Sequence, residues 1–160
     1  MASRALTDLH PDTRRMASQA LEACANDLEL YSAGITVLVT CTYRQNAEQA
    51  LAYAQGRTRE QLDAVGLTDL QPRKGAILTK ARPGESAHNA EDPPGTPAAR
   101  AIDVVPLLHG KPLWGTDADT TWIWLPIAAH FKAAGFRWFG EPEAPFREFP
   151  HFQDPAWRRA

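Results

Sequence analysis

Helical and β-branched segments follow one another in an irregular order along this chain. Apolar positions at 17–31 recur at steps of three and four residues, which predicts one amphipathic helix that ends at Gly34. A continuous β-branched run at 35–40 (ITVLVT) predicts a strand of a type found at the centre of a sheet, and AIDVV at 101–105 predicts a second strand. Because these segments lack a regular strand–helix–strand alternation, the sequence predicts an α+β fold with a small, mainly antiparallel sheet flanked by helices.

Weaker patterns predict the remaining elements. They comprise a helix that ends at Gly56, a short strand at Ala76–Thr79, a hairpin turn around Gly110, a last helix at 120–134 and a strand at 136–140. Pro126 fits the last helix only near its first turn, and the Gly- and Pro-rich stretch 83–97 predicts a loop. No element is expected in the Pro-rich end after Gly140. The chain contains no repeat and no long linker, so residues 1–160 are expected to form a single domain.

The charge and composition of the chain limit its partners. It has 17 Lys and Arg against 19 Asp and Glu, a formal net charge of -2, which argues against nucleic acid or an anionic membrane as a partner. No apolar run reaches the roughly 18 residues of a spanning helix, and the first residues lack the apolar core of a signal peptide. The sequence therefore predicts a monomer without membrane insertion that stays in the cytoplasm until it is released, with Cys24 and Cys41 as free thiols.

An aspartate stands in the middle of the predicted strand AIDVV. Side-chain alternation places Asp103 on the face opposite Ile102, and an ionised carboxylate in a buried strand is costly unless a positive group meets it. His88, in the preceding loop, and His151, near the end of the chain, are candidate partners. Two imidazoles and one carboxylate form a known ligand set of catalytic zinc, which leaves a fourth position for water.

Glu148 is a candidate proton carrier beside this set. It precedes His151 by three positions, but Pro150 argues against a helix, so the segment must bend for both side chains to reach one point. A carboxylate can take a proton from water and deliver it to a leaving amine once its surroundings adjust its pKa. By spacing alone, an isolated loop histidine such as His88 is more often a surface or hydrogen-bonded residue than a metal ligand.

Four motifs connect the chain to a known family. They are TYRQNAEQALAYAQGRT, ILTKARPGESAHN, ARAIDVVP and FREFPHFQ. In this order they resemble the zinc peptidases that include D-alanyl-D-alanine carboxypeptidases and phage L-alanyl-D-glutamate endolysins, and they look most like the endolysin branch. The resemblance implies a hedgehog/DD-peptidase-like zinc peptidase fold, a Zn2+ cofactor and hydrolysis of the L-alanyl-D-glutamate bond in bacterial peptidoglycan stem peptides. It also implies a phage enzyme that degrades the cell wall during host lysis after accumulating in the host cytoplasm.

The resemblance further implies a role for each site residue. The zinc ligands would be His88, Asp103 and His151. Glu148 would be the general base, and Arg44 and Ser86 would contact the substrate. The guanidinium of Arg44 would hold a substrate carboxylate or the developing oxyanion. Two features depart from the family pattern: Ala99 replaces a glycine, and the insert AEDPPGTPAA separates the first histidine from the aspartate. The insert is expected to be a loop at the rim of the site, because extra loop length costs little entropy.

Other interpretations remain open from the sequence. Arg44 could pair with Glu48 one helical turn away, and Ser86 could serve only to cap its loop. The alternative functions are a carboxypeptidase or dipeptidase acting at D-Ala-D-Ala and a non-catalytic, zinc-containing wall-binding module, although Glu148 argues against the latter. A hydrolase triad built from Ser86, His88 and Asp103 is disfavoured, because the chain has no G-x-S-x-G motif.

Overall fold

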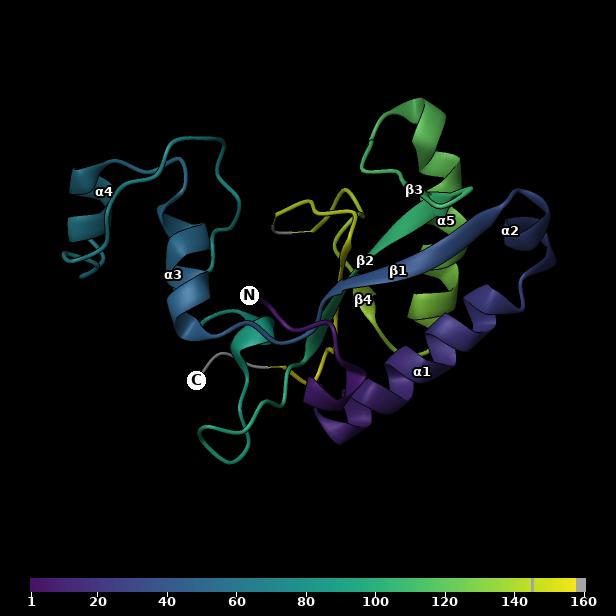
Figure 1. Cartoon of the computed structure of the whole chain (residues 1–160), viewed down its shortest axis with the longest axis horizontal. Coiled ribbons are helices and arrows are strands. Elements are labelled where there is room, and N and C mark those ends of the chain that lie inside the picture. The colour runs from purple at the N-terminus through teal and green to yellow at the C-terminus, as the bar shows by residue number, and fades with distance from the viewer. Residues whose placement is uncertain (145, 158–160) are drawn as a thin grey trace.

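The computed structural model describes residues 1–144 and 146–157 and combines helices with one antiparallel sheet (Figure 1). The elements follow in the order η1 (Leu6–Asp8), α1 (Pro11–Ala25), α2 (Leu28–Ser32), β1 (Ile35–Cys41), α3 (Asn46–Ala54), α4 (Arg59–Asp63), η2 (Ala87–Asn89), β2 (Ala101–Leu108), β3 (Lys111–Pro112), α5 (Ala118–Ala133), β4 (Arg137–Trp138) and β5 (His151–Gln153). The strand order is β1-β2-β5-β4, with β3 paired to the end of β2. These pairings confirm the α+β class and the small antiparallel sheet.

The main hydrophobic core lies between one face of the sheet and helices α1 and α5. Ile102 and Val104 of β2 point into it and pack with buried aromatic residues such as Phe131 of α5 and Phe152 of β5. Asp103 lies between these two apolar positions, so it points to the opposite face of the sheet. Helices α3 and α4 project away from this body and enclose a second, small cluster around Leu62 (Figure 1).

The predicted first helix is wrong in one respect, because two helices occupy its place. Helix α1 ends at Ala25, and the carboxylate of Asp27 accepts hydrogen bonds from the backbone N–H groups of Glu29 and Leu30, which begins α2. Tyr31, counted as part of one apolar stripe, is 78% exposed. The capping side chain of Asp27 therefore starts a second helix, although the apolar spacing alone predicts one continuous helix.

Three other predictions about elements are also wrong. The run 35–40 forms β1 at the edge of the sheet, whereas β2 and β5 have neighbours on both sides. No strand forms at Ala76–Thr79, where backbone carbonyls accept hydrogen bonds from the side chains of Gln55 and Arg57. Pro126 lies inside α5 and not near its first turn, since the buried side chains around it keep the helix packed on the sheet.

The C-terminal strand β5 is absent from the sequence prediction. It is three residues long and follows a turn at Phe149 and Pro150, so its apolar pattern is too short to indicate a strand. The hairpin around Gly110, the helix before Gly56 and the free thiols of the two cysteines agree with expectation. Among the described residues, no helix combines the length and apolar character needed to cross a membrane.

Asp154, directly after β5, holds the C-terminal segment to two other parts of the fold. Its carboxylate is buried and accepts hydrogen bonds from the Thr13 hydroxyl of α1 at 2.7 Å and from the Arg100 guanidinium at 2.9 Å. Burial raises the pKa of Asp154, but these hydrogen bonds outweigh burial and lower it below its usual value. Its contribution to stability is therefore present above the unfolded pKa and is lost as pH falls through the folded pKa.

We expect Asp154→Asn to lower the free energy of unfolding at neutral pH by about 2–4 kcal/mol, because a buried, charge-assisted pair loses its negative partner. Urea unfolding of the mutant and wild-type proteins measures this difference. The exposed turn residue Asp69 offers a matched control, and Asp69→Asn should change stability by no more than about 0.5 kcal/mol. A loss below about 1 kcal/mol for Asp154→Asn would show that a neutral amide serves equally well at this position.

Candidate active site

The site begins as a row of side chains across the sheet. Cys41 of β1 pairs with Asp103 of β2, which in turn pairs with His151 of β5. A bulge at Thr40 shifts the register of β1, so Cys41 and not Thr40 lies opposite Asp103. Cross-strand neighbours on one face lie close together, and this explains why residues so distant in sequence meet.

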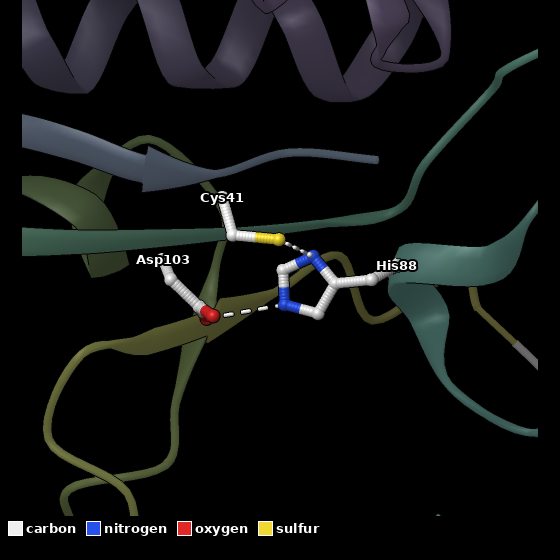
Figure 2. A group of neighbouring side chains, drawn as sticks. All are labelled: Cys41, His88 and Asp103. Atoms are coloured by element: carbon white, nitrogen blue, oxygen red, sulfur yellow. Dashed lines mark hydrogen bonds and ion pairs between the residues drawn. The ribbon is translucent and has the colours of Figure 1, made fainter. Parts of the chain in front are cut away.

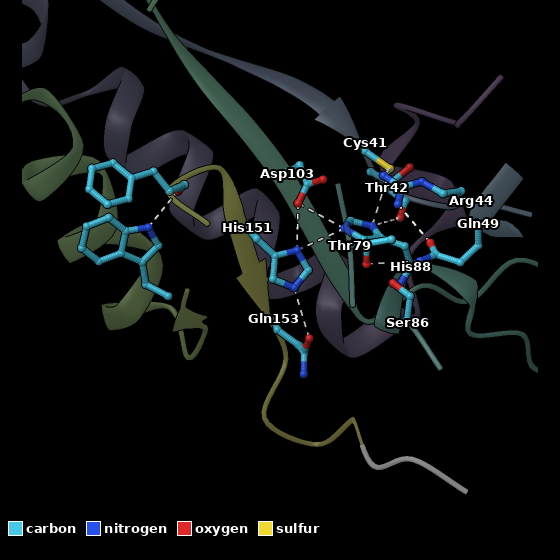
Figure 3. Close-up of polar contacts among 12 residues, drawn as sticks. Cys41, Thr42, Arg44, Gln49, Thr79, Ser86, His88, Asp103, His151 and Gln153 are labelled. Atoms are coloured by element: carbon cyan, nitrogen blue, oxygen red, sulfur yellow. Dashed lines mark hydrogen bonds and ion pairs between the residues drawn. The ribbon is translucent and has the colours of Figure 1, made fainter. Parts of the chain in front are cut away.

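His88 completes the group from above the sheet. It lies in the 3-10 helix η2. Ser86 caps the start of this helix, because its hydroxyl accepts a hydrogen bond from the backbone N–H of His88. His88 Nε2 is 3.1 Å from Asp103 Oδ1 and 3.2 Å from His151 Nδ1. His151 Nδ1 is 2.9 Å from the same carboxylate oxygen, so one atom from each residue meets at a single point (Figure 3).

The outer nitrogens of both imidazoles have partners of their own. His88 Nδ1 is 2.7 Å from the carbonyl oxygen of Thr42, and His151 Nε2 is 3.1 Å from Gln153 Oε1 (Figure 3). A carbonyl oxygen can only accept, so Nδ1 of His88 carries a proton, and Nε2 is the nitrogen that faces Asp103. This kind of support orients histidines that bind metal ions.

The spacing of the three inner atoms suits a small tetrahedral ion. Donors bound at about 2.0–2.1 Å in tetrahedral zinc sites lie about 3.3 Å from one another. The three separations here are 3.1, 2.9 and 3.2 Å, and the donors are two imidazole nitrogens and one carboxylate oxygen. His88, Asp103 and His151 therefore fit zinc in both chemistry and spacing.

Cys41 offers a second possible donor that the sequence analysis considered only as a free thiol. Cys41, His88 and Asp103 have potential ligand atoms within 4.8 Å of one another. The thiol, however, is 3.6 Å from His88 Nδ1, whereas Asp103 contacts Nε2 on the other side of the ring (Figure 2). The position of Cys41 immediately before the TYR motif was the only sequence signal for its proximity.

The buried histidine and aspartate side chains of this group shift one another's pKa values. Burial alone would lower the pKa of His88, but the carboxylate of Asp103 reverses this and raises it well above its usual value. Burial would raise the pKa of Asp103, but His88 and His151 lower it well below its usual value. His88 therefore provides the positive partner that a carboxylate in the middle of β2 requires.

One cavity brings together all the side chains singled out from the sequence. It has a volume of about 190 Å³, and its lining includes Arg44, Ser86, His88, Asp103, Glu148 and His151. Glu148 reaches it because the chain turns at Phe149 and Pro150, with the N–H of His151 donating to the carbonyl of Glu148 at 3.3 Å. Burial raises the pKa of Glu148, an effect that nearby His151 opposes and Asp103 reinforces.

Arg44 is oriented by a residue that the sequence analysis did not consider. Its Nη1 donates to Gln49 Oε1 at 3.0 Å, and the amide nitrogen of the fully buried Gln49 donates to the carbonyl of Ala81 at 2.8 Å. The alternative partner Glu48 instead pairs with the amino group of Met1. Gln49 therefore links Arg44 to the loop on the other side of the cavity.

The insert between His88 and Asp103 folds as a compact loop of its own. The N–H of Ala98 donates to the carbonyl of Ala90, and the N–H of Asp92 donates to the carbonyl of Thr96. The Tyr43 hydroxyl donates to Glu91 at 2.5 Å and fastens this loop near the chain entering α3. The insert residues are absent from the lining of the described cavities around His151.

The cavity combines two imidazoles, two carboxylates and a guanidinium. This set of groups is typical of the active site of a metal-dependent hydrolase. The chain is 31% identical over 152 residues to the peptidoglycan L-alanyl-D-glutamate endopeptidase CwlK of Bacillus subtilis strain 168. The alignment covers 92% of this chain and 74% of CwlK. The chain therefore belongs to the CwlK family of peptidoglycan peptidases. A comparison with protein-family models gives no match.

The chain also resembles two solved structures. The L-Ala D-Glu endopeptidase ChiX of Serratia marcescens is 22% identical, with 96% of this chain and 87% of that chain covered and a TM-score of 0.49. The LD-carboxypeptidase LdcB is 18% identical, with 96% and 70% covered and a TM-score of 0.47.

Proposed function

We propose that this protein is a zinc-dependent peptidase that hydrolyses the L-alanyl-D-glutamate bond of peptidoglycan stem peptides. The main support is the convergence of His88, Asp103 and His151 at the spacing of a zinc site, with Glu148 lining the same cavity. We take the L-alanyl-D-glutamate bond as the scissile bond because the relative CwlK is named as an L-alanyl-D-glutamate endopeptidase. A residue suited to carry protons has no role in a merely structural metal site, so we favour an enzyme over a binding module.

His88, Asp103 and His151 are the zinc ligands in this proposal. The proton on His88 Nδ1, directed at the Thr42 carbonyl, leaves only Nε2 for the metal, and Cys41 lies on the wrong side of the ring to share it. Bound zinc would act as a Lewis acid toward the scissile carbonyl and make a water molecule more acidic. Three protein ligands would leave a fourth position for water, as catalytic zinc sites require.

The other side chains of the cavity supply proton transfer and substrate contact. Glu148 accepts a proton from the attacking water as the new C–O bond forms, and it delivers that proton to the amine as the C–N bond breaks. Its raised pKa brings its affinity for protons closer to what this shuttle needs. Arg44 holds the carbonyl oxygen or a substrate carboxylate, and Ser86 contacts the substrate while it caps η2.

A test uses defined stem peptides and mass spectrometry of the products. The wild type should release L-alanine-ending and D-glutamate-starting fragments, lose activity with a chelator and regain it with zinc. Products cleaved at D-Ala-D-Ala would instead indicate the carboxypeptidase function, and activity indifferent to the chelator would exclude the metal. Zinc bound without hydrolysis of any wall peptide would indicate a binding module.

Gln49 provides a prediction about positioning. We expect Gln49→Leu to lower kcat/KM by about tenfold, because Arg44 loses the hydrogen bond that orients it. Zinc content should remain unchanged, since Gln49 contacts none of the proposed ligands. Gln19→Leu, on the exposed surface of α1, is the matched control. Unaltered kinetics in Gln49→Leu would show that Arg44 needs no support from this amide.

The resemblance to the endolysin branch supports a further proposal about biological role. Residues 1–160 would act as one monomeric catalytic unit that gathers in the host cytoplasm and reaches the wall during phage lysis. Expression in bacteria with and without a separate membrane-permeabilising protein tests this role. Lysis only when both are present is the expected result, and analytical ultracentrifugation measures the oligomeric state.

A further inference from the structure

A larger cavity of about 460 Å³ adjoins the site and shares His151 and Glu148 with it. Two cationic side chains line it, Lys80 from the loop before η2 and Arg137 from β4. Among the described residues, neither cation forms a salt bridge. The cavity therefore presents positive charge directly beside the proposed reaction centre.

The sheet places Arg137 on the same face as the site. Arg137 pairs with Gln153 across β4 and β5, and Gln153 is two residues from His151, so all three side chains share one face. Gln153 also contacts His151 Nε2 at 3.1 Å. The guanidinium of Arg137 lies 5.1 Å from the centre of the Phe139 ring, and this ring packs edge-on against His151 at 4.6 Å.

The negative groups around this cavity leave the two cations available to a ligand. Glu85 is paired with Arg82 at 2.8 Å, and Glu148 also lines the cavity of the proposed metal ligands. Lys80 Nζ lies 5.3 Å from the centre of the Phe146 ring, which also lines this cavity. An anionic ligand is thus the complement of this cavity.

The cavity on the other side of the reaction centre differs in character. Its volume is about 400 Å³, and it shares His151 and Glu148 but adds the exposed Trp114 and Arg147. Two guanidinium groups line this cavity, and each makes a hydrogen bond within the protein: Arg147 Nε donates to the carbonyl of Gly140 at 2.8 Å, and Arg44 Nη1 donates to Gln49 Oε1 at 3.0 Å. Lys80 and Arg137 form no salt bridge with other described residues, so the anionic part of a substrate suits their cavity.

We propose that Arg137, assisted by Lys80, binds the free carboxylate of the glutamate residue on the C-terminal side of the scissile bond. This inference rests on the proposed function. Glutamate has two carboxyl groups and the peptide chain continues through only one, so the other is negatively charged unless it is amidated. The guanidinium fork matches a carboxylate and loses this match with an amide. The protein thereby selects walls in which this carboxyl group is not amidated.

The test compares two synthetic stem peptides that differ only in this group, one with the carboxylate and one with the carboxamide. The wild type should cleave the carboxylate peptide with a kcat/KM about 10–100 times higher, the usual effect of one charge-assisted hydrogen bond. In Arg137→Met this ratio should fall toward one through a higher KM for the carboxylate peptide. Arg137→Lys should recover part of the ratio, and the exposed Arg14→Met on α1 should leave it unchanged.

The outcomes separate this inference from the proposed function. Equal cleavage of both peptides by the wild type, or an unchanged ratio in Arg137→Met, would overturn the role of Arg137. A ratio that falls only in Lys80→Met would also overturn it and assign the carboxylate to Lys80. If the zinc-loaded wild type cleaves neither peptide, the proposed function itself fails and this inference fails with it. Zinc content and thermal unfolding of each variant establish that it is folded.

Discussion

Replacing Glu148 by glutamine is expected to reduce turnover of a stem peptide by about 10²–10⁴-fold, the usual contribution of a general acid–base group. The amide has nearly the shape of the carboxylate but cannot accept a proton from water. Because Glu148 lines the cavity without being a proposed ligand, the variant should still bind about one zinc per chain. Steady-state kinetics and elemental analysis of the same preparation measure the two quantities together.

The pH dependence of the wild type provides an independent check on Glu148. The base must be unprotonated to act, and burial raises its pKa. Activity should therefore begin to fall, as pH is lowered, at a higher pH than an exposed glutamate would produce.

The matched control for Glu148→Gln is Glu143→Gln at an exposed position, which should leave the rate unchanged. A Glu148→Gln protein that retains most of its turnover would exclude this residue as the base.

Asp103→Ala is expected to abolish stable zinc binding. The substitution removes the oxygen that both imidazole nitrogens approach, at 3.1 and 2.9 Å. Loss of a supporting residue outside the ligand set typically weakens metal binding by about 10–100-fold, and loss of a ligand should exceed this. Competition with a chromophoric chelator measures zinc affinity, and hydrolysis of the stem peptide should disappear in parallel.

Cys41→Ala distinguishes the two possible donor sets. If zinc lies among His88, Asp103 and His151, this variant should retain the affinity of the wild type, because the thiol lies beside the other nitrogen of His88. A loss of zinc equal to that of Asp103→Ala would instead favour the set formed by Cys41, His88 and Asp103. Thermal unfolding without metal separates loss of a ligand from loss of packing at the buried Cys41.

The sequence indicated the chemistry of the site better than its architecture. An aspartate within an apolar strand required a positive partner, and His88 and His151 both meet it in the structure. The resemblance to zinc peptidases selected the same residues by their motifs, and the structure places them around one cavity. Gln49 and Gln153 were missed, because a glutamine that orients a neighbour has no distinctive spacing in the sequence.

The sequence by itself determined the α+β class, the buried strand β2 and the face of that strand on which Asp103 lies, since these depend on local apolar patterns. Only the tertiary structure decided that β5 exists and that His151 pairs with Asp103, because a three-residue strand is stable only against its neighbours. It also decided the bulge that brings Cys41 beside His88 and the register that places Arg137 next to Gln153. Such contacts join residues far apart along the chain, and the packing of the whole sheet selects them.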